Sequence, residues 1–266
     1  MLSCLTIALD KDVKFDGSQH DDLVIIEEVR DNILKFTNGE SEQIRSAINN
    51  KEHELPSILY SRPYQNKIRI FGIGANGSNG LNAIFKNVII NKTFKIKNEI
   101  YSVKGIPNYD GNLDFLPYNN GCVNIYTTLT PINIFNKFNH KIFKAILYKY
   151  FIDGNYDASN AVAVEGFTKA ITEYANQQIK DSIAYLLHKV LGKSKESYEF
   201  INTIQIEWDE IKVVHALFHT EEKKMPMIRG KFRSNFVLPK FVGYKIGKGF
   251  GELSLKQLKT DKGGTK

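Results

Sequence analysis

The sequence predicts an α+β fold with two tandem ferredoxin-like (RRM-like) domains and a glycine-rich loop near the C-terminus. Three observations support this prediction. In residues 1–130 the patterns follow the order strand, helix, strands, helix, strands, which is close to one ferredoxin-like unit. Residues 131–266 repeat this scheme loosely, and no low-complexity linker separates the two parts. We therefore expect two packed domains, residues 1–130 and residues 131–266.

The first half begins with a predicted strand over residues 2–9, where apolar side chains dominate. A helix is predicted over residues 21–36, because its apolar residues fall on one face and Asn38-Gly39 marks its end. The further elements expected here are two strands around a turn in residues 58–74, a short helix in 80–88, a strand or hairpin in 92–103 and a strand in 122–130.

The second half continues with two predicted helices, residues 141–152 and residues 163–192, the second of which ends at Gly192. Residues 200–220 are rich in β-branched and aromatic side chains and predict strands. A basic segment follows, and residues 252–255 predict a final strand.

Composition indicates a protein with a sizeable core, since 42% of its 266 residues are hydrophobic. No apolar run reaches the roughly 18 residues that span a bilayer, and the charged start does not resemble a secretory signal. Cys4 and Cys122 are the only cysteines and form no ligand motif. His215 and His219 stand four apart in a strand-like run, which does not favour a helical metal site. We expect a cytoplasmic protein without membrane contact, metal or cofactor.

The charge distribution favours a polyanionic partner. The formal net charge is +7, and the positive residues are concentrated in residues 223–266, which contain only two acids. Within residues 229–248 the cations alternate with aromatic residues and glycines, which is not typical of a solvated basic tail.

A first glycine cluster, Gly72, Gly74 and Gly77, matches the G-x-G-x-x-G pattern between a strand and a helix. Glu99 follows at the distance expected of a ribose-binding acid, so one interpretation is a dinucleotide-binding enzyme. The other interpretation is a strand–turn–helix corner, in which the glycines permit tight turns. The predicted helix of about two turns and the absence of a repeated β–α–β pattern favour the corner.

A second glycine cluster occupies residues 241–253, "FVGYKIGKGFGEL", and leads into a strand. It lacks the G-K-[ST] of a nucleotide-binding P-loop. Glycines without Cβ atoms let backbone amides approach a neighbour closely, either another part of the protein or a phosphate backbone. Lys245 and Lys248 favour phosphate.

The segment "GKFRSNFVLPKFVGYKIGKGFGEL", residues 230–253, resembles the C-terminal glycine-rich signature of the CRISPR repeat-processing endoribonucleases, and most of all the branch of subtype I-B. Residues 55–74 and 129–146 also resemble that branch. The matching positions of the signature are Phe232, Asn235, Leu238-Pro239, Val242-Gly243, Lys245 or Lys248, and Gly249-Phe250-Gly251.

The resemblance implies an endoribonuclease that cuts CRISPR repeat RNA (pre-crRNA) without metal, through attack of the RNA 2′-hydroxyl on the adjacent phosphate. It implies RNA contacts at Arg229, Lys231, Arg233, Lys245, Gly247, Lys248, Gly249 and Gly251. It also implies association with the CRISPR effector complex and a monomer or homodimer.

The branch carries a histidine pair after its first helix, whereas only His53 stands near that place here. The candidate catalytic residues are therefore His53 for proton transfer, with Tyr64 and Arg62 beside it in sequence. Lys67 is a candidate phosphate contact, and His20 is a second candidate base. The missing pair leaves a repeat RNA-binding protein without cleavage activity as an alternative.

Overall fold

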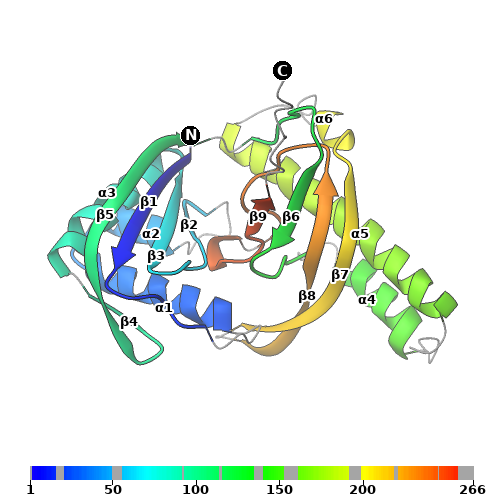
Figure 1. Ribbon diagram of the computed structural model, residues 1–266, viewed down its shortest axis with the longest axis horizontal. Coiled ribbons are helices and arrows are strands. Elements are labelled where there is room, and N and C mark those ends of the chain that lie inside the picture. Colours follow the sequence, from blue (N-terminus) through cyan, green and yellow to red (C-terminus); the bar gives the residue numbers. More distant parts are fainter. Residues whose placement is uncertain are drawn as a thin grey trace, which may run out of the picture.

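The computed structural model describes residues 2–15, 21–49, 56–91, 93–113, 116–134, 140–152, 161–191, 199–218, 221–244 and 246–256. It shows two antiparallel sheets, each with helices against one face, side by side along the long axis (Figure 1). The predicted α+β class with two tandem ferredoxin-like units is confirmed, because each sheet and its helices enclose a separate apolar core.

The first sheet has the strand order β2-β3-β1-β5-β4. Its elements are β1 (Leu2–Leu9), α1 (Asp21–Phe36), α2 (Glu42–Asn49), β2 (Ile58–Tyr60), β3 (Lys67–Ile73), α3 (Gly74–Asn91), β4 (Thr93–Ile96) and β5 (Glu99–Leu113). The three helices pack on the sheet face that carries Leu5, Ile7 and Ile70. Figure 1 shows these helices behind the strands at the left of the molecule.

The second sheet has the strand order β7-β8-β6-β9. Its elements are β6 (Asn124–Thr128), α4 (His140–Leu147), the π-helical turn η1 (Tyr148–Ile152), α5 (Ala161–Leu191), α6 (Glu199–Asn202), β7 (Ile206–Phe218), β8 (Glu221–Ser234), the 3-10 turn η3 (Ile246–Lys248) and β9 (Leu253–Lys256). The long helix α5 packs against this sheet through Ile171, Ala175 and Ile179.

Three helices differ from the sequence prediction, and one of them is α6, which occupies Glu199–Asn202 at the start of the expected strands. Residues 42–49, expected in a loop, form α2, because Ser41 Oγ accepts a hydrogen bond from the Ile44 amide and Ile48 is buried in the core. The helix expected at residues 80–88 begins at Gly74, six residues earlier than predicted. These extra turns pack closely against Ser57 at Gly77. A Cβ on Gly77 would lie 2.5 Å from the Ser57 carbonyl oxygen, so this approach requires glycine.

In the first glycine cluster, Gly72 and Gly77 therefore serve helix–strand packing, while Gly74 has a φ of +65° that favours glycine. A Cβ on Gly72 would lie 2.5 Å from the carbonyl oxygen of Gly77, so the start of α3 rests directly on β3. The described strands of this sheet pair only in antiparallel fashion, whereas a dinucleotide fold needs parallel β–α–β units. Glu99 forms ion pairs with Lys11 and Lys14. The dinucleotide interpretation is not supported.

Candidate RNA interface between the two domains

The second glycine-rich segment, residues 241–251, lies between the two domains. Phe241 and Ile246 are buried in a cluster with Leu2 and Phe71 of the first sheet. Phe250 is buried in a second cluster with Leu23 at the start of α1. The segment therefore contributes apolar side chains to the domain junction.

Three glycines of this segment lie so close to other protein atoms that a side chain would not fit. Gly249 has a φ of +87°, and a Cβ there would lie 2.7 Å from Cγ2 of Ile26 on α1. A Cβ on Gly243 would lie 2.7 Å from the Asn133 carbonyl oxygen, and one on Gly251 would meet the Val242 carbonyl. The lysines of the segment favour phosphate as the close neighbour, but at these three glycines the close neighbour is the protein itself.

Asp22, at the start of α1, binds one arginine from each domain. Its Oδ1 accepts a hydrogen bond from Arg62 Nε at 2.7 Å, and its Oδ2 accepts one from Arg229 Nη2 at 2.8 Å. The Asp22 side chain is 8% exposed, while Arg62 and Arg229 are 31% and 23% exposed. Two cations on one carboxylate leave a net positive charge that faces solvent.

Glu252 forms a second cross-domain node directly after the glycine-rich segment. This buried carboxylate accepts hydrogen bonds from Ser61 Oγ and from the Arg62 backbone amide, the latter at 2.7 Å. Lys240 Nζ lies 3.0 Å from the same carboxylate. Arg62 is thereby held by its backbone on Glu252 and by its side chain on Asp22, and its guanidinium also stacks 4.2 Å from the ring centroid of Phe15.

The predicted cations of β8 share one face of the strand. Arg229, Lys231 and Arg233 alternate with the inward-facing Phe232 and Ile228. Arg233 is neutralised in part by Asp209 at 2.9 Å, and Arg229 is bound by Asp22, while Lys231 is exposed. The β8 face is therefore less positive than the sequence suggests.

Other predicted site residues lie apart or outside the described chain. The side chain of Tyr64 is exposed on the turn between β2 and β3, and Lys67 is exposed at the start of β3. Lys248 is exposed, whereas Gly247 is buried. His53, His20 and Lys245 lie outside the described residues. Their roles, and RNA contact by the glycines, stay predictions.

Sequence reasoning misses the acids Asp22 and Glu252 and the cation Arg69. The sequence indicates only a helix start at Asp22 and only the beginning of the last strand at Glu252. Glu252 does carry a signal, because it is one of two acids in the basic C-terminal segment. Arg69 is exposed on β3. Arg69 and Lys240 both interact electrostatically with the Cys4 thiol. Burial raises the pKa of the Cys4 thiol, and these two cations lower it in part.

No known protein-family profile and no curated protein matches this chain. Solved structures do. One described as "Crystal structure of Cas6b" aligns with a TM-score of 0.59 and 19% identity over 95% of this chain and 98% of that chain. "An RAMP protein binding different RNA substrates" aligns with a TM-score of 0.53 and 16% identity over 97% and 100%. "Crystal structure of CRISPR RNA processing endoribonuclease Cas6b" aligns with a TM-score of 0.50 and 18% identity over 96% and 99%.

These alignments confirm the predicted resemblance at the level of the fold, over nearly the full length of both chains. Among the described helices, none is long and apolar enough to cross a bilayer. The described residues also contain no group of three His, Cys, Asp or Glu side chains arranged to hold a metal ion.

Proposed function

We propose that this protein is an endoribonuclease that cuts CRISPR repeat RNA into mature guide RNAs. The observation that carries the proposal is the near-complete structural alignment with proteins described as Cas6b, one of which is called a CRISPR RNA processing endoribonuclease. The C-terminal glycine-rich signature supports it from the sequence side, because that signature lies at the junction of the two domains.

In the proposed reaction, the 2′-hydroxyl of the RNA attacks the adjacent phosphorus, and the 5′-oxygen of the next nucleotide leaves. The products are a 2′,3′-cyclic phosphate and a 5′-hydroxyl. The nucleophile belongs to the substrate, so the protein has to hold the phosphate in line, move two protons and stabilise the negative charge of the phosphorane. We assign proton transfer to His53.

Arg62 suits charge stabilisation. Its Nε and its backbone amide are fixed on two buried carboxylates from different elements, Asp22 and Glu252. Among the described residues its Nη atoms make no hydrogen bond, and the side chain is partly exposed. A guanidinium that is oriented in advance needs little reorganisation when charge develops on a bound phosphate. Arg229, on the other oxygen of Asp22, adds a second positive charge at the same place.

Cleavage of the cognate repeat RNA in EDTA tests this function. We expect one cut per repeat, and we expect that replacement of the attacking 2′-hydroxyl by hydrogen stops the cut while binding persists. Cleavage of the deoxy-substituted RNA would reject the mechanism, because an external nucleophile would then be at work. His53→Ala should lower the single-turnover rate by roughly 10² or more. His188→Ala on α5 is the matched control, because His188 is exposed on a helix of the other domain.

The second candidate function is binding of repeat RNA without cleavage. It is favoured by the single histidine, His53, where the resembling branch carries a pair. Tight binding of the repeat with no product at any pH would select this function over the first. Under either function, a cytoplasmic location and association with the effector complex, as a monomer or homodimer, are expectations from the sequence.

A further inference from the structure

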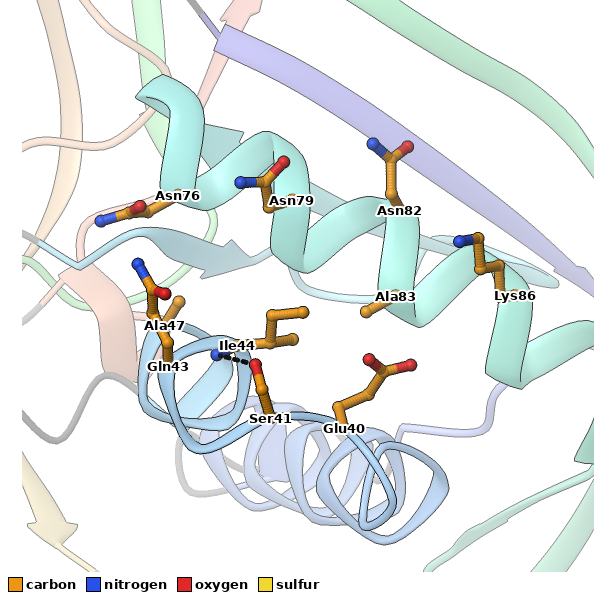
Figure 2. A pocket seen from close by; sticks show the side chains of 10 residues that line it. All are labelled: Glu40, Ser41, Gln43, Ile44, Ala47, Asn76, Asn79, Asn82, Ala83 and Lys86. Atoms are coloured by element: carbon orange, nitrogen blue, oxygen red, sulfur yellow. Dashed lines mark hydrogen bonds between the residues drawn. The ribbon is translucent and has the colours of Figure 1, made fainter.

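A polar groove of about 330 Å³ lies between α2 and α3, on the helical side of the first sheet. Figure 2 shows Gln43 on α2 facing Asn76 on α3, with Asn79, Asn82 and Lys86 following along α3. The floor is apolar and consists of Ile44, Ala47 and Ala83. The groove is thus a narrow channel with an apolar floor and amide walls.

Several polar side chains of this groove have no structural role in the described chain. The side chains of Asn76, Asn79 and Gln43 make no hydrogen bond to any described residue. By contrast, Asn87 donates to Glu40 and to the Ala83 carbonyl oxygen, which explains its place on the helix. The amides of the groove are therefore available to a ligand.

Their presence also opposes the stability of the helix. Asparagine in a helix interior costs about 0.7 kcal/mol relative to alanine, and this cost applies to Asn79, since Asn76 lies in the first turn of α3. Gly77 and Gly80 of α3 are explained by their close contact with Ser57 and Ile58, whereas the side chains of Asn76 and Asn79 make no hydrogen bond to the described residues. Two exposed asparagines on one helical face, facing a glutamine across a groove, are what a binding surface for amide-type hydrogen bonds requires.

The chemistry of the lining favours a nucleobase. Asparagine and glutamine offer a donor and an acceptor side by side, which matches the edge of a base. The apolar floor suits a base, and the volume lies in the range of small-ligand sites. Among the described residues, the charged ones in the lining are Lys86 and Glu40, so the described lining has no net charge and does not favour phosphate alone. Tyr109 donates to Asn82 Oδ1, which fixes that amide with its NH₂ group available.

One end of the groove lies close to Ser57, just before β2. Ala47 lies near the end of α2, after which residues 50–55 lead to β2. Asn76 lies next to Gly77, which touches Ser57 just beyond that segment.

We infer that the groove between α2 and α3 is a subsite for one or two unpaired nucleotides of the RNA. This inference rests on the proposed RNA-binding function. A base-paired stem would not suit the groove, because its base edges are already occupied, whereas an unpaired base presents them.

The test compares two repeat RNAs, a hairpin alone and the same hairpin with its unpaired flanking nucleotides. The variant is Gln43→Ala combined with Asn79→Ala, and the control is Gln177→Ala on α5, where an exposed glutamine bonds only Asp181 in the same helix. We expect the variant to bind the flanked RNA roughly tenfold more weakly, as the loss of about two hydrogen bonds implies. It should bind the bare hairpin as the unmodified protein does.

Two further measurements separate this loss from other causes. Alanine is the better helix former, so the melting temperature of the variant should be unchanged or raised, which excludes unfolding as the cause. Because the lining has no net charge, the affinity ratio between variant and unmodified protein should stay constant between about 50 and 200 mM salt. Equal affinity of both proteins for the flanked RNA would overturn the inference, and so would an equal loss for the bare hairpin.

Cross-linking of short unpaired oligoribonucleotides that carry 4-thiouridine tests binding in the groove without requiring cleavage. We expect light-induced cross-links to peptides of α2 and α3, lost in the double variant. Cross-links confined to other peptides would overturn the subsite even if the repeat is cut. Absence of cleavage together with cross-links at α2 and α3 would reject the nuclease function and leave the subsite standing.

Discussion

Gly249→Ala tests the packing of the glycine-rich segment against the first domain. An alanine at φ +87° costs about 1–2 kcal/mol of backbone strain. Its Cβ would also lie 2.7 Å from Cγ2 and 2.9 Å from Cδ1 of Ile26, which is 2% exposed and enclosed by the core. Overpacking of this kind costs about 1–3 kcal/mol. We therefore expect a total loss of about 2–5 kcal/mol in the free energy of unfolding.

Gly74→Ala is the matched control, because Gly74 has a φ of +65° and a Cβ at that residue would meet no neighbouring atom within 4 Å. Both variants gain the same stabilisation from a stiffer unfolded chain, so the difference between them isolates the contact with Ile26. Urea unfolding followed by far-UV circular dichroism measures both. In the background Ile26→Ala, where the obstructing atoms are absent, Gly249→Ala should cost about 1–3 kcal/mol less. Equal costs of Gly249→Ala and Gly74→Ala would refute this packing.

Three other predictions concern charge and burial. Asp22→Asn should destabilise the protein by about 2 kcal/mol, since it removes the charge between two arginines. In the background Arg229→Met the same change should cost about 1 kcal/mol less. Additive losses of the two substitutions in urea unfolding would contradict this coupling. Lys248→Ala should weaken RNA binding most at low salt and reduce the slope of log affinity against log salt by about 1, while an unchanged slope would remove Lys248 from the interface. Cys122 is exposed and should react quickly with thiol reagents at about pH 8, whereas burial raises the pKa of Cys4 and leaves little reactive thiolate; equal labelling rates in the native protein would contradict this.

The regular elements can be predicted from the sequence because their signals are local. The apolar periodicity of residues 21–36 and the alternation in residues 92–103 need no knowledge of distant contacts, and both elements are found in the structure. The helix α2 is not among the predicted elements, although Ile44, Ala47 and Ile48 recur at the spacing of one helical face, so its local signal is present in the sequence. The first turns of α3 escape prediction because glycine and asparagine oppose a helix locally, and only contact with Ser57 and β3 stabilises them.

The candidate site can be predicted only in part, because its contacts join residues far apart in the chain. A glycine without a Cβ shows that some group is close, but nothing near Gly249 in sequence indicates that the group is Ile26. Arg62 and Arg229 are both candidates because of their charge, and their common partner Asp22 is visible only once the domains are packed. The groove between α2 and α3 is not predictable for the same reason.

The position of the glycine-rich segment has a consequence for how the nascent chain folds. All strands of the first sheet have been synthesised once Leu113 is made, but the described residues that cover the face with Leu2 and Phe71 come later, namely Leu186 of α5 and then Phe241 and Ile246. At about 5–20 residues per second, ribosomes need on the order of ten seconds to reach that segment. During this interval part of the apolar surface of the first domain lacks its cover, and we expect it to be open to chaperones. A truncated chain that ends before residue 241 would lack Phe241 and Ile246, so we expect it to keep part of that surface exposed and to aggregate more readily.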